Sequence, residues 1–438
     1  MKHADTIVEA RWIIPVEPAG VVLEHHSVAI GDGAVLALAP TQEISREYAT
    51  DHSLTLADHL LIPGLVNLHT HAAMTLMRGL ADDKALMDWL KNYIWPAEAR
   101  VLSSQFVHDG TLLACAEMLR GGITCFNDMY FFGADAASAV LKAGMRAVIG
   151  MIVLEFPSPY ASDAGDYLAK GLAVRDALCD EPLLSFAMAP HAPYTVSNAT
   201  LERVATYAAE LDVPVHIHLH ETLEEIDESI AAHKVRPIER LHEVGLLGPA
   251  LIAVHAVHME PGEIALLGEL GCSVAHCPSS NLKLASGIAP IAKMLASGVN
   301  VGVGSDGAAS NNRLDVLAEL RLAALLAKGV SADPTVLPAH AALHMATLAG
   351  AKALGLDHKI GSIVPGKRAD LAAVELSGIE VSPCYDPASH VVYAAGREHV
   401  THVWVDGQLC VEDRALLGID ARELKLKASN WKEKILRG

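Results

Sequence analysis

Residues 62–71 read IPGLVNLHTH, an apolar run that ends in two histidines separated by one residue. Side chains at positions i and i+2 of a strand point to the same face, so His69 and His71 are placed to hold one metal ion together. A lone His-x-His pair is weak evidence of a metal site. Its position at the end of an apolar strand strengthens the interpretation, because active sites of parallel barrels lie at the carboxyl ends of the strands.

Eight short apolar runs, of which this is the first, alternate with helical patterns along the middle of the chain. They are residues 65–69, 123–128, 146–153, 184–189, 213–219, 251–257, 272–277 and 299–305. Apolar strands that alternate with helices favour parallel β/α units, and eight of them favour a closed (β/α)8 barrel of the TIM type. The alternative is a doubly wound open sheet. No Gly-x-Gly-x-x-Gly follows the first run, which weighs against that alternative.

The two ends of the chain carry a different pattern. Residues 27–37 and 402–411 each show alternating apolar residues around an Asp-Gly turn, which is a strong signal of a β-hairpin. We therefore expect an α/β protein in which both termini form one small β-sandwich domain, residues 1–60 and 365–438. Residues 61–364 would form the catalytic barrel.

Composition excludes several classes of function. The chain has 438 residues and a formal net charge of −19, which disfavours binding to nucleic acid or to an anionic membrane. It has no apolar run long enough to cross a bilayer, and its first residues lack the pattern of a signal peptide. The seven cysteines include no Cys-x-x-Cys pair. We expect a cytoplasmic protein that binds a small molecule.

Further polar side chains end the fifth, sixth and eighth predicted strands. They are His216, His218 and His220 on the fifth, His255 and His258 on the sixth, and Asp306 on the eighth. Each step of two residues advances about 6.6 Å, so the three histidines of the fifth strand cannot all contact one metal, and spacing alone does not say which one does. Unpaired buried polar groups are costly, so their gathering at one end of the barrel predicts a metal site.

With these motifs the chain resembles the amidohydrolase superfamily, in the branch of cytosine, guanine and adenosine-analogue deaminases and triazine hydrolases. The resemblance covers nearly the whole chain. It is carried by residues 63–71 (PGLVNLHTH), 216–221 (HIHLHE), 276–284 (HCPSSNLKL), 304–307 (GSDG) and 365–371 (PGKRADL).

The resemblance implies one divalent metal ion per subunit, held by His69, His71, His218 and Asp306. His218 is chosen because the family's ligand precedes its catalytic glutamate by three positions, as His218 precedes Glu221. Binuclear relatives carry a bridging lysine on the fourth strand, and residues 184–189 contain none. Zinc is favoured by the histidine ligands and by hydrolytic chemistry, although iron fits the same donors.

The expected chemistry is hydrolytic deamination. A bound divalent metal lowers the pKa of its water from about 15.7 to about 7, which supplies hydroxide for attack on a ring carbon that bears an amino group. The resemblance implies that Glu221 shuttles a proton to a ring nitrogen, Asp306 passes a proton to the departing ammonia, and His255 orients the hydroxide. Glu221 also has a simpler interpretation, as a carboxylate in the first turn of a helix.

Residues 72–106 resemble the region that covers the substrate in the methylthioadenosine/S-adenosylhomocysteine deaminases. The resemblance implies that Trp89 lies against the substrate, that Glu98 accepts hydrogen bonds from the ribose hydroxyls, and that His191 and His218 contact the nucleoside. The simpler alternative is an amphipathic helix that only buries aromatic side chains.

The predicted substrates are 5′-methylthioadenosine, adenosine or S-adenosylhomocysteine, each converted to its inosine analogue and ammonia. In part of the family, arginines after the third strand bind the homocysteine carboxylate, but residues 151–169 contain no arginine. We therefore expect S-adenosylhomocysteine to be the poorest of the three.

Two alternatives use the same barrel, namely a guanine or other nucleobase deaminase and a triazine-type chlorohydrolase. A third is an inactive scaffold protein, which is disfavoured because all four implied ligands and Glu221 are present. Relatives often form dimers or tetramers, so the resemblance is compatible with a homo-oligomer.

Overall fold

The computed structural model describes residues 1–437, and the chain divides into two compact units. One unit contains Met1–Val66, Ala116–Cys125 and Asp315–Ile419, and the other contains Asn67–Cys115, Phe126–Leu314 and the chain from Asp420 onward. No helix among the described residues has the length and apolarity that a membrane span requires. The domain limits at residues 60 and 365 stay a prediction.

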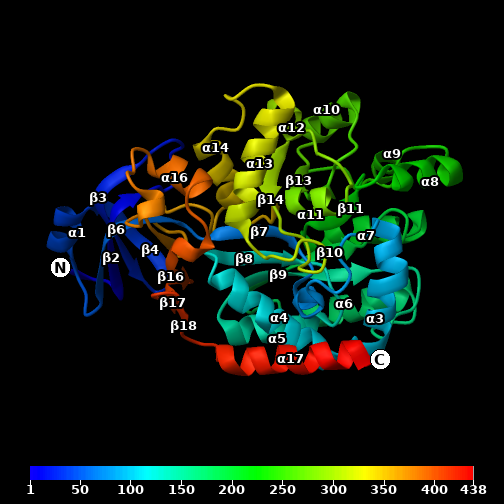
Figure 1. Cartoon of the computed structure of the whole chain (residues 1–438), viewed down its shortest axis with the longest axis horizontal. Coiled ribbons are helices and arrows are strands. Elements are labelled where there is room, and N and C mark those ends of the chain that lie inside the picture. Colours follow the sequence, from blue (N-terminus) through cyan, green and yellow to red (C-terminus); the bar gives the residue numbers. More distant parts are fainter. Residues whose placement is uncertain (438) are drawn as a thin grey trace. The chain divides into compact units, whose positions relative to one another are not determined.

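Eight strands form the barrel sheet in the order in which they follow one another along the chain, from β7 to β14 (Figure 1). Their bounds are β7 (Leu65–Thr70), β8 (Ile123–Asp128), β9 (Arg146–Val153), β10 (Leu184–Pro190), β11 (Val215–Leu219), β12 (Leu251–His255), β13 (Ser273–His276) and β14 (Asn300–Val303). The pairings from β9 to β14 are parallel. The predicted (β/α)8 barrel is confirmed, and the doubly wound alternative is wrong, because its strand order would reverse at a switch point.

Helices alternate with these strands along the chain. They include α4 (Ser104–Leu119), α5 (Gly133–Ala143), α6 (Ala164–Leu178), α7 (Asn198–Leu211), α8 (Leu223–His233), α9 (Pro237–Glu243), α10 (Pro261–Glu269), α11 (Pro278–Lys283) and α12 (Ile291–Ala296). In α7 the side chain of Ser197 caps the first turn, and Leu201, Val204 and Ala208 are buried. This is the apolar face that a period of 3.6 residues produces.

Three of the predicted strands end earlier than their apolar runs. β12 stops at His255, where His255 (φ 69°) and Ala256 (φ 46°) take left-handed backbone conformations, and Asp306 beyond β14 does the same (φ 59°). Such conformations are uncommon outside glycine and cluster at functional sites. They turn the chain out of the strand at the residues for which the sequence predicts chemistry.

Both ends of the chain contribute to a separate sheet, as predicted. Its order is β18-β17-β16-β15-β6-β2-β3-β4, and its bounds are β2 (Thr6–Ile13), β3 (Leu23–Gly31), β4 (Ala34–Pro40), β6 (Ser53–Pro63), β15 (Leu371–Glu375), β16 (Val400–Val405), β17 (Gln408–Glu412) and β18 (Ala415–Leu416). The predicted hairpins are β3–β4 and β16–β17. Asp32-Gly33 and Asp406-Gly407 all have positive φ, as a two-residue type I′ turn requires.

The last helix, α17 (Ala421–Arg437), packs on α3 (Trp95–Val101), one of the helices that follow β7. The indole Nε1 of Trp431 donates to Oδ2 of the buried Asp109 at 3.0 Å, and the Trp431 ring meets that of Phe106 edge to face. The end of the chain therefore supports a helix that borders the site described next.

Candidate active site

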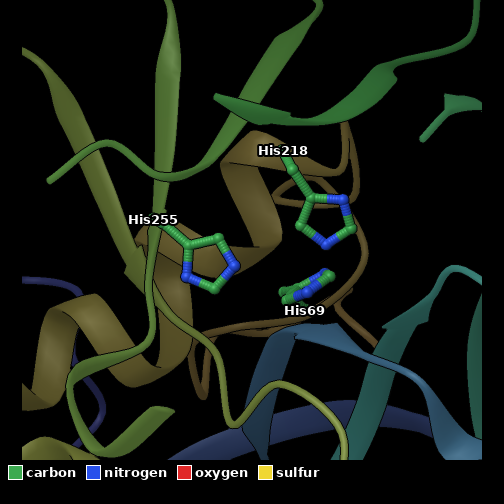
Figure 2. Close-up of side chains that lie close together, drawn as sticks. All are labelled: His69, His218 and His255. Atoms are coloured by element: carbon green, nitrogen blue, oxygen red, sulfur yellow. The ribbon is translucent and has the colours of Figure 1, made fainter. Parts of the chain in front are cut away.

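Five polar side chains gather at the carboxyl ends of the barrel strands. The donor atoms of His69, His218 and His255 lie within 4.8 Å of one another, and so do those of His69, His71 and Asp306. Figure 2 shows the rings of His218 and His255 close to that of His69. We call these five residues the donor group. All come from the same compact unit.

Asp306 is the anion of the donor group. Its Oδ1 lies 3.3 Å from Nε2 of both His69 and His71, and its Oδ2 accepts hydrogen bonds from Ser280 Oγ (2.6 Å) and Ser310 Oγ (2.7 Å). Burial opposes ionisation, but the contact with His69 and the charges of the neighbouring histidines hold the pKa of Asp306 well below its usual range. The site therefore contains a buried carboxylate that stays ionised.

Backbone carbonyl oxygens orient two of the histidines. Nδ1 of His71 donates to the carbonyl of Met129 at 2.6 Å, and Nδ1 of His218 donates to that of His191 at 2.7 Å. Because a carbonyl can only accept, each Nδ1 carries the proton and each Nε2 faces the donor group with its lone pair. Histidines that bind metals are held in this way.

His69 supplies the test of whether a cation fits. Its Nδ1 is 2.9 Å from Nε2 of His216, whereas its own Nε2 is buried and has no hydrogen-bond partner among the described residues. Burial lowers the pKa of His69 to about 4, so the ring is neutral near pH 7. A buried nitrogen without a hydrogen bond, beside an ionised carboxylate, is costly unless a cation satisfies both. The donor set therefore fits a metal ion.

His216 and His218 on β11, and His220 directly after it, have separate environments. Of these described residues, only His218 belongs to the donor group; His216 supports His69, and Nε2 of His220 accepts from the backbone N–H of Ile238 at 3.2 Å. His258 also lies outside the donor group, with its Nε2 at 2.7 Å from the carbonyl of Ser286. Spacing had left the choice on this strand open.

Glu221 lies beside the donor group. Its Oε2 is 3.7 Å from Nε2 of His255, its Oε1 accepts from Ser286 Oγ at 3.1 Å, and burial raises the pKa of Glu221. Helix α8 has Thr222 as its N-cap, so Glu221 precedes the helix. Its carboxylate lines the cavity over the donor group, so the simpler interpretation as a first-turn carboxylate is wrong.

The cavity over the donor group has a volume of about 300 Å³, within the range of small-molecule sites. Four of the five residues of the donor group line it, together with Glu221, Glu98, His191 and Trp89. Apolar side chains form most of the remaining wall: Leu86, Leu90, Ile94, Trp95, Phe131, Leu154, Phe156, Pro157 and Pro159. No lysine or arginine is among the described residues that line it.

The segment after β7 is mostly helical. It contains the 3-10 helix η1 (Ala72–Met77), α2 (Leu86–Trp89), the π-helical turn η2 (Leu90–Ile94) and α3. Trp89, Trp95 and Glu98 line the cavity, whereas Tyr93 is exposed and lies outside it. The alternative of a helix that buries aromatic side chains is right about the helix, and these side chains also line the cavity.

Glu98 is partly buried, and its Oε1 accepts from the hydroxyl of Tyr130 at 2.5 Å. Burial raises the pKa of Glu98 despite this hydrogen bond. Burial also lowers the pKa of His191 to about 3, so that ring is neutral. Sequence analysis missed Tyr130, although it follows β8 closely and the rule of polar residues after strands could have found it.

Comparison with known proteins agrees with this geometry. Residues 60–410 match the model of the amidohydrolase family, and the chain belongs to that family. It is 46% identical to a 5-methylthioadenosine/S-adenosylhomocysteine deaminase of Saccharophagus degradans, over 99% of this chain and 97% of that protein.

Two solved structures are also similar. An adenosine deaminase from Xanthomonas campestris with bound zinc superimposes with a TM-score of 0.99, at 46% identity over the whole of both chains. An atrazine chlorohydrolase from Arthrobacter aurescens shares the fold at 23% identity, with a TM-score of 0.89 over 98% of this chain and 100% of that one. The predicted class, a metal-dependent hydrolytic deaminase of this family, is confirmed. The cytoplasmic location and the homo-oligomer stay predictions.

The buried Glu225 predicts a pH dependence of stability. Its carboxylate accepts from the backbone N–H groups of His220 (3.0 Å) and Glu221 (2.8 Å), yet burial raises its pKa to about 7. Between the unfolded pKa, near 4.5, and about 7 the folded state holds a proton that the unfolded state has lost. Stability from this group is therefore complete at low pH and is lost as the pH rises through 7.

Glu225→Gln removes that titration. From pH 5 to pH 8 the free energy of unfolding of the variant, relative to the wild type, should rise by on the order of 2 kcal/mol. Urea unfolding at both pH values measures this change, with Glu224→Gln as an exposed control on the same helix. A difference between variant and wild type that stays constant with pH would contradict the assignment.

Proposed function

We propose that this protein hydrolyses the 6-amino group of 5′-methylthioadenosine and adenosine to give the inosine analogue and ammonia. The observation that carries the proposal is one cavity lined by four residues of the donor group, by Glu221, and by Glu98 and Trp89. The relative from S. degradans supports the choice of a 5′-substituted adenosine, since it carries the name of that activity.

We assign His69, His71, His218 and Asp306 as the ligands of one zinc ion. Three imidazoles and a carboxylate are donors that zinc accepts, and the zinc in the X. campestris structure supports that metal. Strand β10 has no lysine, which supports a single ion. When bound, a divalent metal lowers the pKa of a water ligand to about 7, so a nucleophile exists at neutral pH.

The chain's own groups move the protons. Water adds to the ring carbon, the bond from that carbon to the amino nitrogen breaks, and ammonia leaves. Glu221 takes a proton from the water and gives it to the adjacent ring nitrogen; its burial and raised pKa suit a group that must hold a proton for part of the cycle. Asp306 takes the second proton to the departing amino group, and His255 orients the water.

Recognition of the nucleoside falls to the residues around Glu98. A carboxylate can accept hydrogen bonds from both hydroxyls of a ribose, and Tyr130 already holds Oε1 in place. Trp89 packs on the substrate and His191 contacts its base. The apolar wall suits a methylthio group, and the absence of lysine or arginine among its described residues leaves the carboxylate of S-adenosylhomocysteine unpaired.

The first experiment follows ammonia release by the zinc-loaded protein. Its substrates are methylthioadenosine, adenosine, S-adenosylhomocysteine, guanine and cytosine. We expect the first two to have the highest kcat/KM, with S-adenosylhomocysteine at least tenfold lower, since an unpaired buried charge costs more than about 1.4 kcal/mol. Turnover of a free base alone would reject the role of Glu98. Equal turnover of S-adenosylhomocysteine would reject the account of the apolar wall.

The ligand assignment predicts metal content. Asp306→Asn and His71→Ala should lose most of the zinc after dialysis, because each removes a donor, whereas His255→Gln should keep it. Mass spectrometry of the metal measures this, and His258→Asn is a control because His258 lies outside the donor group. Loss of zinc from His255→Gln would make His255 a ligand instead.

Glu98→Gln tests ribose recognition. The variant should lose about 10- to 100-fold in kcat/KM for adenosine, the value of one charged hydrogen bond, and little for 2′,3′-dideoxyadenosine, which has no hydroxyls to bind. Steady-state kinetics on both substrates measures the ratio. Glu202→Gln, exposed on α7, serves as the control. An equal loss on both substrates would place Glu98 elsewhere in the reaction.

A further inference from the structure

The stretch HCPSSNLKL, residues 276–284, is a motif for which the proposed mechanism has no role. In the structure it leaves β13 at His276 and forms the short helix α11. The loop that follows reaches Ser286.

This stretch with its loop contacts the two groups that carry protons in the proposed mechanism, Asp306 and Glu221, and also His255, which orients the water. Ser280 Oγ donates to Asp306 Oδ2 at 2.6 Å, and Ser286 Oγ donates to Glu221 Oε1 at 3.1 Å. Between them, Oδ1 of Asn281 lies 2.8 Å from Nδ1 of His255. One short piece of chain thus holds the acid, the base and the imidazole together.

Asn281 is the centre of this piece. It is buried, with 1% of its surface exposed. Its backbone N–H donates to the carbonyl of Cys277, and its own carbonyl accepts from the N–H groups of Ser286 (2.8 Å) and Gly287 (3.4 Å). The backbone of Asn281 therefore sets the loop that carries Ser286, while its side chain contacts His255.

We propose that Asn281 is a positioning residue that fixes the tautomer of His255. An amide oxygen only accepts, so Nδ1 of His255 carries the proton and Nε2 keeps its lone pair. That Nε2 is 3.7 Å from the Glu221 carboxylate and belongs to the donor group. In the other tautomer Nε2 would donate a hydrogen bond instead of accepting one from the attacking water. The role in catalysis rests on the proposed function.

Two substitutions test whether Asn281 acts as a hydrogen-bond acceptor or only fills space. Asn281→Leu has similar volume and no acceptor, whereas Asn281→Asp accepts a hydrogen bond but cannot donate one. In the zinc-loaded protein Asn281→Leu should lower kcat about 10- to 100-fold with KM nearly unchanged, as loss of a group that orients an active-site histidine does. Asn281→Asp should stay within tenfold of the wild type.

A matched control is Asn300→Leu. Asn300 donates to Ser273 Oγ at 3.0 Å at the first residue of β14, the opposite end of a barrel strand from the site. This control should leave kcat unchanged. Full kcat in Asn281→Leu, or an equal loss in Asn281→Asp and Asn281→Leu, would overturn the proposal.

A double-mutant cycle tests whether Asn281 acts through His255 or has only a structural role. In a His255→Gln background, adding Asn281→Leu should change kcat by less than twofold, because the residue acts through His255. Additive losses would overturn the proposal.

Nitrogen NMR of His255 in the zinc-loaded protein gives a readout without turnover. Its signal is assigned by its loss in His255→Gln. The wild type and Asn281→Asp should show a protonated Nδ1, and Asn281→Leu should not. The same protonation state in Asn281→Leu would overturn the proposal. A wild type that deaminates no nucleoside would reject the proposed function, while this spectrum would still decide the tautomer.

Discussion

An ionised carboxylate buried at the mouth of the barrel, that of Asp306, needs donors and positive charge around it. Two serine hydroxyls supply the hydrogen bonds, and two imidazoles lie 3.3 Å from its other oxygen. Burial keeps the His69 ring neutral, so this imidazole does not supply a charge opposite the carboxylate. A cation would therefore complete the arrangement around Asp306. The hydrogen bonds that Nδ1 of His71 and Nδ1 of His218 donate to backbone carbonyls leave the Nε2 atoms of these rings to bind it.

One cavity holds the groups proposed for the reaction and those proposed for substrate selection. The donor group and Glu221 lie on or just after the barrel strands β7, β11, β12 and β14, whereas Glu98 lies on α3 and Tyr130 follows β8. The rest of the wall is apolar and therefore rewards shape more than charge. A site arranged in this way can keep its reaction while the lining between β9 and α6 changes the substrate, because function depends on the residues of the site and not on the fold.

Periodicity and turn chemistry predicted much of the fold, because both are local. The eight apolar runs became the eight strands, and the Asp-Gly pairs became type I′ hairpins. The end of β12 was predicted too late, because the left-handed backbone at His255 ends the strand before its apolar run does. The choice of His218 over its neighbours came from resemblance, since strand alternation alone predicts that His216, His218 and His220 share one face.

The candidate site was predicted less completely where contacts join distant parts of the chain. The π-helical turn η2 changes which side chains of its segment face the cavity, and no residue pattern announced it. Asn281 lies within the motif of residues 276–284 and Ser286 lies just beyond it, but nothing local shows that they would contact His255 and Glu221. Side-chain hydrogen bonds across strands require the register of the barrel, which the sequence does not state.

The first and last barrel strands meet through paired hydrogen bonds between Asn67 and Ser305, residues 238 positions apart. The backbone N–H of Asp306 also donates to the carbonyl of His69 at 2.9 Å. The two parts of the donor group therefore come together only when the ring of strands closes, which has a large cost in chain entropy. Any cation that bridges His69 and Asp306 binds the closed ring and not the open chain, so its binding free energy adds to the stability of closure. A metal ion bound there would therefore stabilise the closed barrel.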